Sequence, residues 1–191
     1  MALFMNSAQG GMVTADTRLE NGKEANDWNE CIRIGNLMAD EALRIISPAA
    51  VQENPKVYCA SKMIDFPLEN EAMKFVFRNS PVAALAEKKT TDFSKVTTRI
   101  NLLNIGTAQV LTIPGEALPN IGFYVKRHMK TDQPFLFGLT NDAFGYILTK
   151  EDFNGFERYN YVSRTSLGEM TGEIYGREAL KMIQENPAAG Q

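Results

Sequence analysis

The sequence predicts an α/β protein built on a mixed sheet flanked by helices. Three observations support this fold class: strand-like and helix-like segments alternate along the chain, two strand-like segments form a hairpin, and a further strand ends abruptly in polar residues. A hairpin pairs its strands antiparallel, which makes the sheet mixed rather than purely parallel. With 191 residues, 44% of them hydrophobic and 23% charged, the chain is long enough for one main core.

The first third of the chain predicts a strand, a long loop and a helix. Residues 1–5 form an apolar run that resembles a buried strand without a preceding cap or polar lead, as in a domain cut from a longer chain. Residues 6–26 are polar and contain glycine, which favours a loop. Between Trp28 and Ile45, apolar residues recur at steps of three and four, predicting a helix that ends at Ser47-Pro48.

The middle of the chain predicts a strand over residues 57–66, a short amphipathic helix over 70–78, and a hairpin. The hairpin joins residues 97–103 to 109–113 across 104–107. Its second strand runs into Pro114-Gly115-Glu116. Pro119 fits only the first turn of the helix that follows, so Glu116 should lie in the strand-to-helix loop.

The last third predicts a strand over residues 135–139 and a final helix. The strand ends in the polar segment 140–146. Thr171 is the predicted N-cap of the helix, which should bury Tyr175, Ala179, Met182 and Ile183 before Pro187. Residues 1–186 then form the domain, and residues 187–191 a disordered tail.

Composition excludes several classes of function. The formal net charge is −3 and like charges do not cluster, so binding to nucleic acid or to an anionic membrane is not predicted. No apolar stretch is long enough for a transmembrane segment, and residues 1–5 lack the charged lead of a signal peptide. Cys31 and Cys59 lack metal-type spacing, so we expect free, buried thiols.

Candidate site residues lie at two predicted strand ends, where open α/β sheets bind ligands. Glu116 is either a metal-binding or catalytic carboxylate or a first-turn carboxylate stabilised by the helix dipole, and position alone favours the second role. Tyr146 by itself is more typical of a core tyrosine. His128, the only histidine, falls near a helix end, where it would complement the dipole. These residues assemble neither a serine-histidine triad nor a complete histidine zinc site.

Three segments resemble the neutral (non-lysosomal) ceramidase family. Ile113-Pro114-Gly115-Glu116 and the segment from Gly138 to Ile147 are similar to two successive signatures of that family, in order and in spacing. Residues 2–11 resemble its glycine-rich strand and loop. The resemblance extends over nearly the whole chain and maps to the C-terminal half of the family's catalytic domain. It therefore implies that the chain belongs to a larger catalytic domain.

The resemblance also implies site residues. In the family, the matching glutamate and tyrosine bind the catalytic zinc together with histidines of the upstream half, which implies Glu116 and Tyr146 as metal ligands here. A downstream tyrosine that polarises the amide carbonyl matches Tyr159, followed by Asn160 where the family has glutamate, and Tyr161 is the alternative. The family's loop serine, a proposed nucleophile, has no counterpart in residues 10–16, so Thr14 is the candidate substitute.

The activity implied by the resemblance is zinc-dependent hydrolysis of the amide bond of ceramide-like N-acyl lipids. A longer enzyme would carry it out, and this chain alone would be inactive because it lacks the upstream half and its ligands. Two alternatives stay open: a related metal-dependent amidase or esterase with another substrate, and a noncatalytic binding or assembly domain of the same fold. The resemblance is compatible with a secreted or periplasmic location, with any signal peptide upstream.

Overall fold

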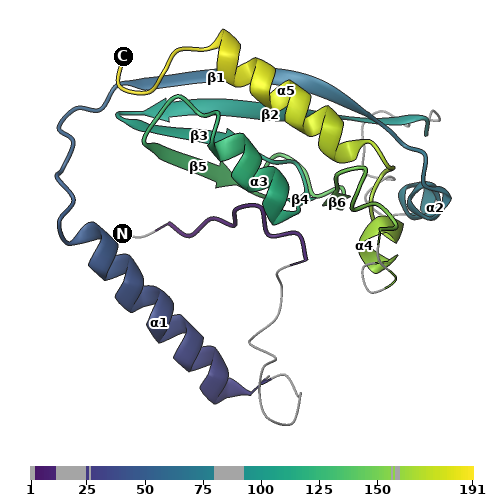
Figure 1. Cartoon of the computed structure of the whole chain (residues 1–191), viewed down its shortest axis with the longest axis horizontal. Helices are drawn as coiled ribbons and strands as arrows, with labels where there is room; N and C mark the ends of the chain where they lie inside the picture. Colours follow the sequence, from purple (N-terminus) through teal and green to yellow (C-terminus); the bar gives the residue numbers. More distant parts are fainter. Residues whose placement is uncertain (1–2, 12–24, 26, 80–92, 156, 158–159) are drawn as a thin grey trace. The chain divides into compact units, whose positions relative to one another are not determined.

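The computed structural model describes residues 3–11, 25, 27–79, 93–155, 157 and 160–191. The chain divides into two compact units, one of residues 12–54 and one of residues 1–11 with 55–191. Along the chain, the helices and strands are as follows (Figure 1): α1 (Trp28–Ile46), β1 (Val57–Pro67), α2 (Glu71–Asn79), β2 (Lys95–Ile105), β3 (Ala108–Thr112), β4 (Glu116–Ala117), α3 (Pro119–Lys126), β5 (Gln133–Phe137), β6 (Tyr146–Ile147), α4 (Asn160–Arg164) and α5 (Thr171–Glu185).

The described part of the smaller unit is dominated by α1, which confirms the predicted helix. Asp27 caps it, since its Oδ1 accepts the N–H of Glu30 at 2.9 Å, and Glu30 pairs with Arg33 at 2.6 Å. No residue of α1 is buried, and Trp28 and Leu43 are 77% and 62% exposed. Among the described residues, no helix combines the length and the apolar character needed to cross a membrane.

The larger unit is built on a four-stranded sheet in the order β1-β2-β3-β5. β1 and β2 pair antiparallel from Val57↔Ile105 to Pro67↔Lys95, and β2 turns into β3 through the two residues Gly106-Thr107. β5 returns parallel to β3 after the chain has passed through β4 and α3. The predicted hairpin and the mixed α/β fold class are both confirmed.

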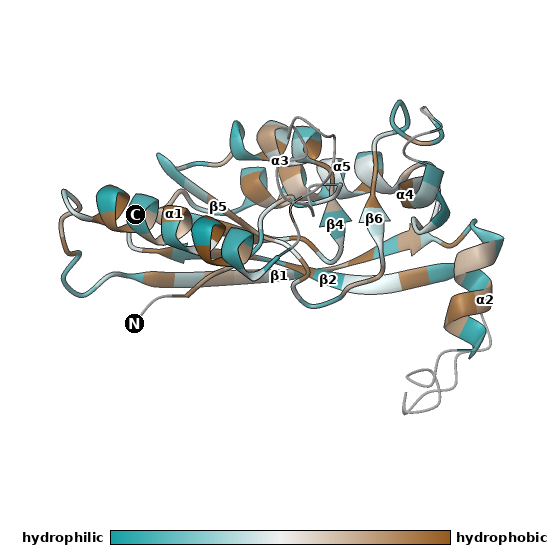
Figure 2. Ribbon diagram, turned by 90° about the horizontal axis from the view of Figure 1, so that it is seen from below, coloured by the Kyte–Doolittle hydropathy of each residue, from teal (hydrophilic) through white to brown (hydrophobic). Residues whose placement is uncertain are grey.

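One face of the sheet carries the core. Helices α3, α4 and α5 lie on the same side of the sheet (Figures 1 and 2). Alternate residues of β2 point to that side and are buried, including Ile100 and Leu102, both fully inaccessible. α5 contributes the four side chains expected from its sequence, Tyr175, Ala179, Met182 and Ile183. Burying a large apolar side chain of this kind stabilises the fold by about 1.5–3 kcal/mol.

The opposite face of the sheet is exposed and partly apolar. Met63, Ile105 and Phe135 are 53%, 44% and 49% exposed, and each lies between residues of β1, β2 or β5 that point to the core. No helix in the described part of this unit covers that face. A face of this composition is typical of a surface that another layer of structure covers.

Three sequence predictions need correction. Residues 3–5 form no strand, and Leu3 and Phe4 are 80% and 70% exposed, because a short apolar run does not by itself determine a pairing partner. Thr171 is the first helical residue rather than the N-cap, and its Oγ1 accepts the N–H of Leu148 at 3.1 Å instead. Cys31 and Cys59 are free but exposed, not buried.

Residues 187–191, predicted as a disordered tail, contact the sheet. The carbonyl of Pro187 accepts hydrogen bonds from the side chains of Asn104 at 3.0 Å and Gln109 at 3.4 Å, and Ala189 donates to the carbonyl of Lys130 at 3.2 Å. Asn104 and Gln109 are buried, so their amides need partners. The tail supplies a carbonyl that satisfies them.

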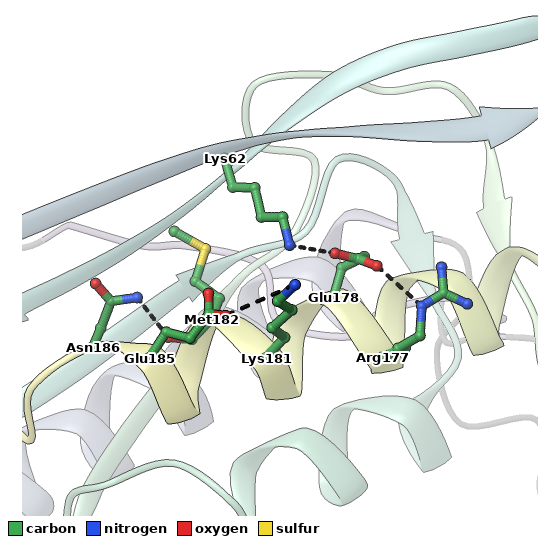
Figure 3. A network of polar contacts seen from close by, with 7 residues as sticks. All are labelled: Lys62, Arg177, Glu178, Lys181, Met182, Glu185 and Asn186. Carbon is green, nitrogen blue, oxygen red and sulfur yellow. Dashed lines mark hydrogen bonds and ion pairs between the residues drawn. The ribbon is translucent and has the colours of Figure 1, made fainter.

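An ion pair links α5 to β1. Lys62 donates to the Glu178 carboxylate at 2.5 Å, and Arg177 donates to the same carboxylate at 3.0 Å (Figure 3). Only 31% of the Lys62 side chain and 19% of the Glu178 side chain is exposed. The hydrogen bond from Lys62 holds the pKa of Glu178 below its usual range.

Glu178→Gln should lower the free energy of unfolding at pH 7 by up to about 1 kcal/mol, the upper end for a partly exposed pair. Because the folded-state pKa of Glu178 is depressed, its contribution is present above the unfolded pKa of about 4.3 and disappears as pH falls through the folded value. Denaturant titrations at pH 7 and at pH 3 would measure both differences. Glu185→Gln is the control, since Glu185 is 58% exposed and 3.8 Å from its partner Lys181. Equal losses at both pH values would contradict the prediction.

Candidate functional site

The site is built on a short parallel pair of strands, β4 and β6. Glu116 is in register with Tyr146, and Ala117 with Ile147. The N–H of Glu116 donates to the carbonyl of Gly145 at 2.9 Å, and the N–H of Leu118 donates to that of Ile147 at 3.1 Å. Residues in register project to the same side of a sheet. The structure therefore brings together the two predicted metal ligands, and places Glu116 in a strand rather than in a free loop.

A second tyrosine adjoins this pair. Tyr146 donates its N–H to the carbonyl of Thr165 at 3.0 Å, which brings the end of α4 against β6. Tyr161 of α4 then packs edge-to-face on Tyr146, with ring centroids 5.8 Å apart and an interplanar angle of 89°. Tyr161, which is 48% exposed, is the alternative named above for the carbonyl-polarising tyrosine.

The N-terminal segment is hydrogen-bonded to β4, the other strand of the pair. Gly10 donates its N–H to the carbonyl of Ala117 at 2.8 Å, and Gly138 donates to the carbonyl of Asn6 at 2.7 Å. A Cβ at position 10 would lie 2.6 Å from the carbonyl oxygen of Glu116, so only glycine allows this approach. All three segments that resemble the ceramidase family thus meet at one place.

The loop before Tyr146 is conformationally unusual. Leu139 and Asn141 have φ angles of 50° and 75°, and Gly145 has 113°. The side-chain amide of Asn141 donates to the carbonyl of Arg99 at 3.0 Å and to Oγ1 of Thr112 at 3.1 Å, which fixes the loop to β2 and β3. A left-handed non-glycine residue costs about 1–3 kcal/mol, and such residues cluster at functional sites.

The electrostatics keep the Tyr146 phenol neutral. Burial is the main cause that raises its pKa above the ordinary value, followed by the negative charge of Glu116 and the proximity of Tyr161. Both Tyr146 and Glu116 are half-buried. The site thus offers a carboxylate next to a protonated phenol, which is a hydrogen-bond donor in the absence of a cation.

The donor atoms fit part of a metal site. Glu116 and Tyr146 supply two hard oxygen atoms, whereas a catalytic zinc takes three protein ligands and a water. No group of three or more His, Cys, Asp or Glu side chains gathers anywhere in the described residues. His128 is exposed beyond the end of α3, where its Nδ1 lies 2.8 Å from the carbonyl of Tyr124. Within the described part of the chain, Glu116 and Tyr146 alone would not complete such a site.

The remaining predicted residues, Thr14 and Tyr159, lie outside the described residues. Conversely, the structure adds residues that the sequence did not indicate. Thr165 pairs with Tyr146, and Asn70 bonds to the residues around Thr165. Neither lies in a recognisable motif, so no sequence signal pointed to them.

No protein-family model matches the sequence, and no curated protein sequence matches it. Solved structures do match. The neutral ceramidase from Pseudomonas aeruginosa superposes with a TM-score of 0.58 at 16% identity, over 90% of this chain and 36% of that chain. A ceramidase complexed with C2 gives a TM-score of 0.57 at 15% identity, over 85% and 36%. The fold of this chain corresponds to about a third of the length of each of these ceramidases.

Gly145→Ala should disrupt the β4–β6 pair. An added Cβ would collide with the carbonyl oxygen of Thr165, and the φ of 113° alone costs roughly 1–3 kcal/mol for a non-glycine residue. Chemical denaturation should show at least this loss in the free energy of unfolding. Gly176→Ala is the matched control: it lies within α5 with open space around its Cβ position, and should stabilise by about 0.5–1 kcal/mol. Equal effects of both substitutions would refute the role given to Gly145.

Proposed function

We propose that this chain is part of a zinc-dependent amidohydrolase that cleaves the amide bond of ceramide-like N-acyl lipids. The observation that carries the proposal is the register of Glu116 with Tyr146 on β4 and β6. It places a carboxylate and a phenol side by side within a fold shared with neutral ceramidases.

In this proposal Glu116 and Tyr146 hold the zinc together with histidines from a segment beyond these 191 residues. Glu116 offsets the positive charge, and Tyr146 contributes its phenol oxygen. A zinc ion with an open coordination position supplies polarisation of a bound carbonyl and lowers the pKa of a bound water to about 7. The neutral state of Tyr146 without metal is compatible with this role, because a nearby cation favours the phenolate.

Other residues of the chain would bind and orient the substrate. A tyrosine O–H that donates to the amide oxygen stabilises the negative charge developing there. The resemblance proposes Tyr159 for this role, with Tyr161 as the alternative, and the contact of Tyr161 with Tyr146 and its exposed surface support Tyr161. Thr14 stays the proposed substitute for the family's loop serine. Thr14 lies three positions after Gly11 in the sequence, and Gly10 donates its backbone N–H to Ala117 of β4.

The rest of the catalytic domain would cover the exposed face of the sheet. Two observations support this part of the proposal: the chain spans only 36% of the ceramidases it matches, and Met63, Ile105 and Phe135 expose apolar surface on that face. Burying such surface contributes about 25 cal/mol per Å². A covering layer could also carry the missing ligands.

The 191-residue chain alone should bind zinc weakly and hydrolyse no ceramide, because two oxygen ligands are too few for a tight catalytic site. Isothermal titration with zinc, compared with a longer polypeptide that includes the upstream coding region, measures the difference. Glu185→Ala serves as the control for Glu116→Ala. Tight, stoichiometric zinc binding by the short chain that Glu116→Ala abolishes would mean that the chain holds a complete site.

In the longer polypeptide, Glu116→Gln and Tyr146→Phe should each lower kcat/KM for ceramide by more than about 100-fold, since changing even an outer partner of a metal ligand costs 10–100-fold. Glu185→Gln and Tyr124→Phe keep the same chemistry at exposed positions and should leave the rate near the parent value. A panel of N-acyl amines and esters separates an amide-specific enzyme from a related esterase. Turnover unaffected by either site variant would overturn the assignment.

A further inference from the structure

Asn70 bonds to two separate parts of the larger unit. Its Oδ1 accepts the N–H groups of Ala72 at 3.0 Å and Met73 at 3.4 Å, which caps α2. Its Nδ2 donates to the carbonyls of Ser163 at 3.3 Å, Arg164 at 2.9 Å and Ser166 at 2.9 Å. One side chain therefore joins the start of α2 to the end of α4.

Asn70 donates to carbonyls of residues on both sides of Thr165 in the sequence. Thr165 is itself hydrogen-bonded to both Tyr146 and Tyr161. Its carbonyl accepts the N–H of Tyr146 at 3.0 Å. Its own N–H and Oγ1 donate to the carbonyl of Tyr161, at 3.1 Å and 2.8 Å. A displacement of residues 163–166 would therefore change the position of Tyr161 relative to Tyr146.

The neighbouring space allows such a displacement. A cavity of about 390 Å³ borders Asn70, Ser163 and Arg164. α4 is only five residues long, so few of its last carbonyls can be paired within the helix. The carbonyl of Ser163 also accepts the N–H of Ser166 at 3.3 Å, whereas Asn70 is the donor to those of Arg164 and Ser166. Loss of the Asn70 donors would leave the carbonyls of Arg164 and Ser166 without these bonds and would allow residues 163–166 to shift toward the cavity.

We propose that Asn70 is a positioning residue that sets the orientation of Tyr161 against Tyr146. The functional meaning of this role rests on the proposed function, in which both tyrosines belong to the site. Only an amide combines an acceptor for the α2 cap with N–H donors for the α4 carbonyls. The position of a site tyrosine is thus controlled by a residue 91 positions earlier in the chain.

The two roles of Asn70 are separable by substitution. Asn70→Asp and Asn70→Ser keep a side-chain acceptor for the α2 cap, but neither has the amide N–H groups. Asn79→Asp is the matched control, because Asn79 lies at the other end of α2 and its amide donates to the carbonyl of Phe75 at 2.7 Å. The serine variant adds no negative charge, so the test can be made with it if the aspartate variant does not fold.

The measurement is NMR of the 191-residue chain carrying ring-labelled tyrosine. The six tyrosines give six ring signals, and Tyr146→Phe identifies the signal of Tyr146. Tyr161→Leu removes the neighbouring ring and defines the shift of that signal when the contact is lost. Asn70→Ser and Asn70→Asp should move it in the same direction, while the signal of the buried Tyr175 stays in place as a marker of an intact core.

An unchanged Tyr146 signal in Asn70→Ser, with Tyr175 also unchanged, would show that Asn70 only caps α2 and would overturn the proposal. A shift of equal size in Asn79→Asp would overturn it too. The outcome is independent of metal binding. If Asn70→Ser shifts the signal but Glu116→Ala leaves zinc binding of the longer polypeptide intact, the positioning role stands and the proposed function fails.

Discussion

The backbone pairing of β4 with β6 is the constraint on which the candidate site depends. Two residues on each strand pair in parallel, and the hydrogen bond from Glu116 to the carbonyl of Gly145 determines which side chains face one another. The N-terminal segment adds a hydrogen bond at Ala117, and Thr165 adds one at Tyr146. Four stretches of chain from distant parts of the sequence therefore meet within a few residues.

Such short pairings are stable only because larger elements hold their ends. A typical hydrogen bond contributes about 0.5–1.5 kcal/mol net, which is too little for a two-residue ladder by itself. β4 follows β3 of the main sheet and leads into α3. Leu148, the residue after β6, donates its N–H to Oγ1 of Thr171 at the start of the core helix α5. The buried residues of these elements include Leu111, Ile121 and Tyr175. The hydrophobic core thus places the strand ends, and the strand ends place Glu116 and Tyr146.

The candidate site holds a carboxyl group next to a half-buried phenol. Burial is the main cause that raises the pKa of the Tyr146 phenol, and the neighbouring negative charge of Glu116 raises it further. The sheet also leaves one face exposed, and the matched ceramidases are longer than this chain. Under the proposed function, further polypeptide would supply the remaining zinc ligands and cover this face.

The sequence alone determined the elements with strong local signals: the α1 periodicity, the hairpin at Gly106, and the α3 start at Pro119. It also indicated that Glu116 and Tyr146 follow strands, because apolar runs end there. Only the tertiary structure decided the β4–β6 register, the approach of Tyr161 and the bonds of Asn70. Those contacts join residues 15 to 96 positions apart. Periodicity reports which face of an element is buried, whereas such contacts depend on the path of the whole chain.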